Sequence, residues 1–119
     1  MSERSDIEQA VSLFFEAINQ NNAAIVPLTD DVVMCGPMMP EQMTGEAAVR
    51  QYITDIAPFI SRAIPETTII EGDSAAVIVS FEMLNGVTVQ GAEFFRVRDG
   101  QIWHDQVFFD TRVLFKGGN

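Results

Sequence analysis

The stretch Ala75–Val113, AAVIVSFEMLNGVTVQGAEFFRVRDGQIWHDQVFFDTRV, decides the fold. It contains two pairs, Asn85-Gly86 and Asp99-Gly100, that favour positive φ at both residues, as a two-residue type I′ hairpin turn requires. The pairs divide the stretch into three segments rich in Val, Ile and Phe: Ala75–Leu84, Val87–Arg98 and Gln101–Val113. The pattern predicts a three-stranded antiparallel meander.

The beginning of the chain predicts helix. Ser5 and Glu8 have the spacing of a capping box, and apolar residues follow them at helical intervals. A helix is therefore expected from about Asp6 to Gln20. A short helical turn is expected next, over Ala23–Leu28.

A further helix and two strands are expected before the meander. The helix begins at Glu46 after Thr44 as N-cap, and Pro58 ends or kinks it. The strands are Val32–Cys35 and Thr67–Glu71. No long parallel crossovers are present, which excludes a doubly wound sheet and favours an α+β fold. Residues 1–119 are expected to form a single domain.

The composition excludes several classes of function. The net charge of −10 and a pI of about 4.2 argue against binding to nucleic acid or to anionic membranes. Cys35 is the only cysteine, so no internal disulfide is expected, and the polar N-terminus lacks a signal core. Phosphate-loop, zinc-protease and serine-hydrolase motifs are missing. We expect a soluble, cytoplasmic protein with no metal and no cofactor.

Four local patterns extend over nearly the whole chain: Phe14–Ile18, Asp30–Val33, Thr44–Tyr52, and Phe95–Ile102 followed by Phe108–Asp110. On these patterns the chain resembles nuclear transport factor 2-like domains, and within them the SnoaL-like polyketide cyclases and ketosteroid isomerases. The resemblance implies a cone-shaped (cystatin-like) α+β fold, with N-terminal helices packed on a strongly curved, mixed, mostly antiparallel sheet. It also implies a homodimer, and cofactor-independent isomerase, dehydratase or cyclase chemistry on a polycyclic or terpenoid-like substrate.

The catalytic residues that the resemblance implies are only partly present. The region of the family's general-base aspartate is Cys35–Pro37 here, which has no carboxylate. The family's oxyanion tyrosine falls near Phe14 or Phe15, which lack a hydroxyl, and an acid of the cyclase-like members is replaced by Val107. The family's second oxyanion acid aligns with Glu93.

Glu93 lies within an apolar segment of the expected meander. If its side chain faces the cavity, desolvation raises its pKa and makes it an acid or a hydrogen-bond donor. The alternative is a glutamate on the outer face, solvated or paired with Arg96 or Arg98.

His104 and Asp105 are alternative partners for Glu93. A regular Asp99-Gly100 turn places His104 opposite Phe95 and on the same face as Glu93. The family pattern instead places Asp105 on the pocket face. The two registers differ by one β-bulge.

The first hypothesis is therefore a small apolar-ligand pocket with Glu93 as acid and His104 or Asp105 as base. The expected lining residues are Phe14, Met34, Tyr52, Ile56, Phe81, Phe95, Trp103, Val107 and Phe109. The second hypothesis is a non-catalytic module of the same fold that binds a ligand or a protein. Because Phe94, Phe95, Phe108 and Phe109 cannot all face one side of a sheet, a homodimer through its outer face is also expected.

Overall fold

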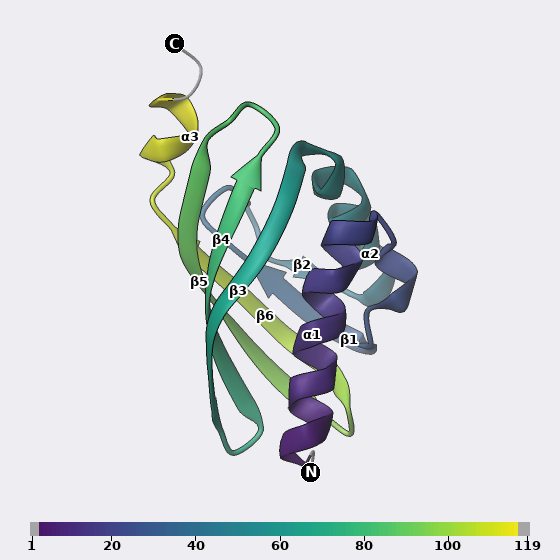
Figure 1. Ribbon diagram of the computed structural model, residues 1–119. Helices are drawn as coiled ribbons and strands as arrows, with labels where there is room; N and C mark the ends of the chain where they lie inside the picture. Colours follow the sequence, from purple (N-terminus) through teal and green to yellow (C-terminus); the bar gives the residue numbers. More distant parts are fainter. Residues whose placement is uncertain (1–2, 117–119) are drawn as a thin grey trace.

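The computed structural model describes residues 3–116, and these form one curved sheet with helices against one face (Figure 1). The elements in chain order are α1 (Arg4–Gln20), β1 (Leu28–Cys35), β2 (Met43–Thr44), α2 (Glu46–Ile56), β3 (Ile60–Glu71), β4 (Ser74–Met83), β5 (Thr88–Arg98), β6 (Gln101–Phe109) and α3 (Arg112–Lys116). Short 3₁₀ turns occupy Ala23–Ile25 and Ala57–Phe59. The sheet has six strands in the order β2-β1-β6-β5-β4-β3. Only the β1–β6 pair is parallel, which confirms the expected mixed, mostly antiparallel α+β fold.

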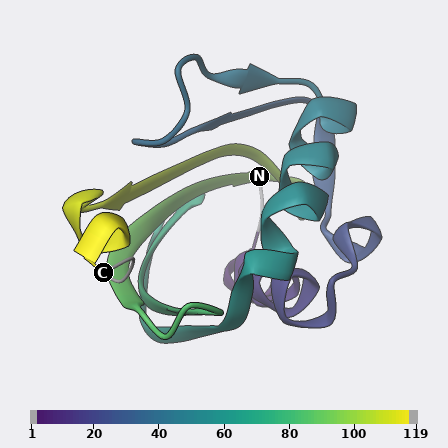
Figure 2. The same cartoon turned by 90° about the horizontal axis from the view of Figure 1, so that it is seen from above.

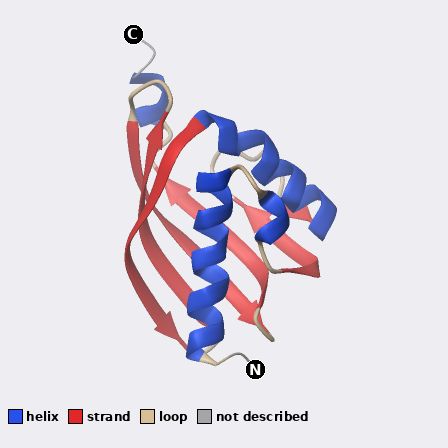
Figure 3. Cartoon of the chain, turned by 45° about the vertical axis from the view of Figure 1, so that its right-hand side comes forward, coloured by secondary structure: helices blue, strands red, loops and turns tan. Residues whose placement is uncertain are grey.

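The sheet bends around the helices. Seen from above, the long strands curve around one side and α2 (teal) stands across the other (Figure 2). The helices α1 and α2 cover the concave face (Figure 3). None of the helices within residues 3–116 is long and apolar enough to cross a membrane.

Both expected helices form, but their side-chain caps do not. Helical hydrogen bonding begins at Glu3, whose carbonyl accepts from Asp6 and Ile7, so Ser5 lies inside the first turn and not at the N-cap. Before α2 the N-cap is Gly45, at φ 101°, because Thr44 is paired with β1. The capping-box and Thr44 predictions are therefore wrong, although α1 and α2 end close to the expected residues.

The two hairpin turns differ. Asp99 and Gly100 both have positive φ, 52° and 77°, as predicted for a two-residue turn. At the other hairpin only Gly86 has positive φ, and the Met83 N–H donates to the Val87 carbonyl across a three-residue loop. The predicted type I′ turn at Asn85-Gly86 is therefore wrong.

A β-bulge at Trp103 sets the register of the last strand. Ile102 pairs with Val97, but His104 pairs with Arg96, so Trp103 is an additional residue between the two pairs. The register predicted from a regular turn, with His104 opposite Phe95, is wrong; Asp105 takes that position. The strand also ends at Phe109, before the helix α3, and does not continue to Val113.

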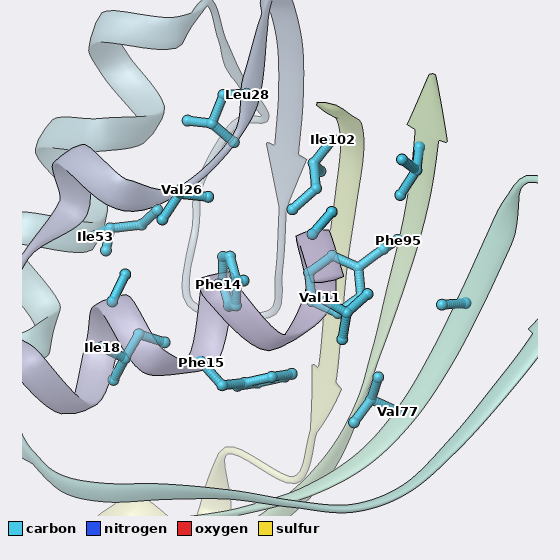
Figure 4. Close-up of a cluster of buried hydrophobic side chains, with 14 of the residues drawn as sticks. Val11, Phe14, Phe15, Ile18, Val26, Leu28, Ile53, Val77, Phe95 and Ile102 are labelled. Carbon is cyan, nitrogen blue, oxygen red and sulfur yellow. The ribbon is translucent and has the colours of Figure 1, made fainter. Parts of the chain in front are cut away.

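The core lies between α1 and the concave face. Phe14, Phe15 and Phe95 meet edge to face, with ring centroids 5.1–5.9 Å apart, and each is almost completely buried (Figure 4). Val11 and Val77 pack in the same cluster. This packing fixes α1 against the middle of the sheet, with one end of the cup left open.

Candidate functional site

A cavity of about 400 Å³ lies beside this core, between α1, α2 and the concave face. Its walls are apolar apart from the side chains of Tyr52 and Glu93. The lining residues are Phe14, Ile18, Met34, Met38, Tyr52, Ile56, Phe59, Ile60, Phe81, Met83, Val89, Glu93, Val107, Phe109 and Leu114. A hollow of this size and polarity is suited to a small hydrophobic ligand.

The alternation of β5 turns Glu93 inward. Val89, Glu93, Phe95 and Val97 are buried, while Gln90, Arg96 and Arg98 are exposed. Glu93 is only 2% exposed. The alternative in which Glu93 lies outside with the arginines is therefore wrong.

The bulge in β6 turns Asp105 inward as well, to a buried position beside Glu93 that is not itself part of the cavity lining. Asp105 is 1% exposed and lies opposite Phe95, while Glu93 lies opposite Val107. The two acids are thus diagonal neighbours on adjacent strands. Within residues 3–114 no N–H or hydroxyl group donates to either Asp105 carboxyl oxygen or to Glu93 Oε2. The two carboxyl groups lie against each other, and a hydrogen bond between them requires one of them to be protonated.

Burial and proximity set the protonation of the pair. Burial is the main cause that raises the pKa of Glu93 well above its ordinary value, and the charge of Asp105 raises it further. Burial also raises the pKa of Asp105, to about 7, although the hydrogen bond from Glu93 opposes the shift. Near neutral pH the pair therefore holds one proton on Glu93, and Asp105 is the group that titrates.

Tyr52 of α2 and Cys35 of β1 also lie near the two acids. Burial, followed by the charges of Glu93 and Asp105, raises the pKa of the Tyr52 hydroxyl, which therefore stays protonated. The Cys35 thiol donates to the Asp105 main-chain carbonyl at 4.0 Å, and burial raises its pKa. Tyr52 can thus supply a second hydrogen-bond donor to a ligand beside Glu93, whereas Cys35 remains a thiol.

The expected lining residues fall into two groups. Phe14, Met34, Tyr52, Ile56, Phe81, Val107 and Phe109 line the cavity, and their contact with a ligand remains a prediction. Phe95 instead lies in the core. Trp103 and His104 lie on the outer face, where the guanidinium groups of Arg96 and Arg98 are each 5.8 Å from the Trp103 ring. His104 is therefore not placed to act on a ligand in the cavity.

Two residues at the mouth also line the cavity, although they were not among the expected lining residues. Met38 and Phe59 are 51% and 65% exposed and still line the cavity. Phe59 follows Pro58 in a 3₁₀ turn at the end of α2, and no local pattern distinguishes it from a core aromatic. The only available signal was the group of methionines that contains Met38.

The position expected for a general base is filled by packing. A Cβ atom added to Gly36 would lie 2.6 Å from Val107 Cγ1. Val107 thus occupies the space that a side chain at residue 36 would need. The acids of this cavity come from β5 and β6, and no group of three or more His, Cys, Asp or Glu side chains within the described part of the chain is placed to hold a metal ion.

Comparisons with known proteins agree with this architecture. The SnoaL-like domain profile matches residues 11–105. No curated protein sequence matches the chain. A nuclear transport factor 2-like protein from Cytophaga hutchinsonii superposes with a TM-score of 0.79 at 22% identity, covering 97% of this chain and 99% of that one.

Two other similar structures belong to proteins named as enzymes. A ketosteroid isomerase assigned by similarity, from Kribbella flavida, superposes with a TM-score of 0.78 at 20% identity, covering 89% of this chain and 78% of that one. An LEH-like epoxide hydrolase of M. tuberculosis superposes with a TM-score of 0.77 at 19% identity, covering 95% and 89%. At these identities the similarity shows the fold alone.

Proposed function

Because the chain belongs to the SnoaL-like domain family, we propose that it is a cofactor-independent acid–base catalyst of the isomerase, dehydratase or cyclase type. Its substrate is a small, mostly apolar molecule held in the cavity. One observation carries the proposal: Glu93 is the carboxyl group at the wall of an otherwise apolar cavity, and the buried carboxyl group of Asp105 lies against it.

Each carboxyl has a separate role. Glu93 keeps its proton near neutral pH, so it is the acid, or the hydrogen-bond donor to a substrate oxygen. Asp105, whose pKa is about 7, loses its proton within the physiological range and is the base that acts through Glu93: it accepts the Glu93 proton while Glu93 accepts one from the substrate. The surroundings of the two carboxyl groups shift their pKa values by different amounts, so two residues with the same functional group take opposite roles.

The apolar wall supports this chemistry. Aromatic and aliphatic side chains surround Glu93 at the cavity wall, so a proton leaving a substrate carbon is transferred to the carboxyl pair through Glu93 and not to solvent. The hydroxyl of Tyr52 can hydrogen-bond to the same ligand. No step of the reaction then requires a group that the chain itself does not provide.

A double-bond shift offers a direct test. Bicyclic β,γ-unsaturated ketones are incubated with the protein, and the conjugated product is followed by its ultraviolet absorbance. We expect turnover that Glu93→Gln and Asp105→Asn each reduce by roughly 100-fold or more, as for removal of a general acid or base. His104→Gln is the matched control and leaves the rate unchanged.

The alternative is a binding module of the same fold without catalysis. It predicts that ligands bind to the wild type and to both carboxyl variants alike, and that no ketone is turned over. The convergence of an acid and a proton acceptor on one cavity favours the catalytic proposal over this alternative.

A further inference from the structure

The charge inside the cavity is negative and is not balanced by the cavity wall. Of the lining residues that the structure describes, none is Lys, Arg or His. His104, Arg96 and Arg98 lie on the opposite face of the sheet. With one proton on the carboxyl pair, the Asp105 carboxylate has no cationic partner in the cavity, an arrangement that is costly in an apolar site.

The carboxyl oxygens of the site that lack a hydrogen-bond partner within residues 3–114 are acceptors. Both oxygens of Asp105 and the Oε2 atom of Glu93 receive no hydrogen bond from the N–H and hydroxyl groups of residues 3–114. Glu93 lines the cavity, so a ligand can complete its Oε2 atom by bringing a hydrogen-bond donor. An enolate or a carboxylate ligand brings only more acceptors and a second negative charge.

The remaining wall is rich in aromatic rings. Phe14, Tyr52, Phe81 and Phe109 all contribute to the lining. Aromatic rings attract cations through the negative charge density of their faces, more strongly where water is excluded. The overall charge of −10 adds a field that draws cations toward the protein.

We propose that this cavity recognises positive charge on a hydrophobic skeleton: it binds hydrophobic amines in their protonated form, and its reaction passes through a cationic intermediate and not through an enolate. The first part concerns binding alone. The second part rests on the proposed function.

The cationic reaction can be written with the two carboxyls alone. In a double-bond shift the Glu93 O–H bond breaks and a C–H bond forms at one alkene carbon, which leaves the other carbon positive. The ionised Glu93 carboxylate, with the Asp105 carboxyl behind it, then removes a proton from the next carbon, and the electrons of that C–H bond form the new double bond. Glu93 thereby regains its O–H bond, so nothing is oxidised, reduced or consumed.

Three ligands with the same adamantane skeleton test the binding. 1-Adamantylamine is a cation near pH 7.5, 2-adamantanone is neutral and 1-adamantanecarboxylate is an anion. Titration calorimetry of the full chain with each ligand should give an affinity for the amine at least tenfold higher than for the ketone. The carboxylate should bind at least tenfold more weakly than the ketone.

Two variants identify the source of the preference. Asp105→Asn removes the cavity charge and should bring the amine and the ketone within threefold of each other. Glu71→Gln removes one negative charge at an exposed position of β3 and should leave the preference as in the wild type. If Asp105→Asn does not fold, the order of the three wild-type affinities still tests whether the cavity prefers positive charge.

The possible results separate this inference from the proposed function. Equal affinities, a preference for the carboxylate, absence of binding by all three, or an amine preference that survives Asp105→Asn would each overturn the charge recognition. Turnover of ketones without an amine preference would reject the cationic inference and retain acid–base catalysis. An amine preference without any turnover would retain the charge recognition and reject the catalytic function.

Discussion

The carboxyl groups of Glu93 and Asp105 lie against each other across adjacent antiparallel strands, although Glu93 pairs with Val107 and Asp105 pairs with Phe95. The diagonal contact exists because both side chains point to the concave face and both are almost fully buried. It makes the two acids one titrating unit with one proton near neutral pH.

Protein stability should fall as the pH rises toward 7. Between about pH 4 and about pH 7 the folded protein keeps a proton on Asp105 that the unfolded chain has released, so unfolding becomes easier by up to about 1.4 kcal/mol per pH unit. Glu93 contributes with the same sign, and Tyr52 and Cys35, which also face the pair, stay neutral there. Urea unfolding from pH 5 to pH 8 measures the slope.

Self-repulsion of an acidic protein also makes its stability fall as the pH rises. The comparison with Asp105→Asn therefore isolates the contribution of Asp105. The variant should lose part of the slope and be more stable than the wild type at pH 8. Parallel curves for the two proteins would show that Asp105 does not titrate in this range.

His104 should be dispensable for any reaction in the cavity. Its ring packs on the outer face near Phe94 and Trp103, with centroids 6.1 and 6.0 Å away. His104→Ala should therefore leave ligand affinity and turnover within about twofold of the wild type, as expected for a surface substitution away from the site. A loss of turnover as large as that of Glu93→Gln would mean that the β6 register is wrong.

Two glycines should differ in their tolerance of a methyl group. A Cβ at Gly91 would lie 2.4 Å from the Phe108 carbonyl oxygen, a main-chain atom that moves only with its strand. At Gly36 the contact is with a Val107 methyl group, which can rotate. We expect Gly91→Ala to cost about 2–3 kcal/mol and Gly36→Ala about 1 kcal/mol in the free energy of unfolding.

Chemical denaturation of the two variants measures this difference. Gly36→Ala serves as the matched control, because it adds the same atom against the same strand, β6. Equal losses would mean that β6 shifts as easily as a valine side chain does.

We expect the protein to be a homodimer through the outer face of the sheet. Ile78 pairs with Ala92, and Ala92 with Phe108, so the three form a row across β4, β5 and β6. Ile78 and Phe108 are 41% and 50% exposed, which leaves apolar area available for a second copy. Light scattering should give twice the chain mass, and Phe108→Asp should reduce it to that of the monomer.

Local sequence patterns predicted the architecture because its elements follow local rules. The helical spacing of apolar residues before Gln20 predicted α1. The preference of Asp99 and Gly100 for positive φ predicted the last turn, and both residues adopt it. The predicted N-caps were wrong where another contact holds the residue. Thr44, for example, pairs with β1 and so is not the N-cap of α2.

The site could be predicted only in part. Glu93 emerged as an acid in an apolar strand, but the choice between His104 and Asp105 depended on a bulge. That bulge is accommodated by contacts that are distant in the sequence: Val33 and Met34 of β1 pair with His104 and Asp105. No pattern within β6 itself contains this information.

The extra residue at Trp103 has an evolutionary consequence. The side chains of β6 alternate between the two faces of the sheet. The bulge decides which of these two sets faces the cavity. A lineage that lost the bulge by a slip of the strand would turn the His104 imidazole inward in place of the Asp105 carboxyl, and would turn Val107 and Phe109 outward, without any substitution in β6. In this fold the chemistry of a pocket can therefore diverge through strand register alone, while the sequence of the strand stays constant.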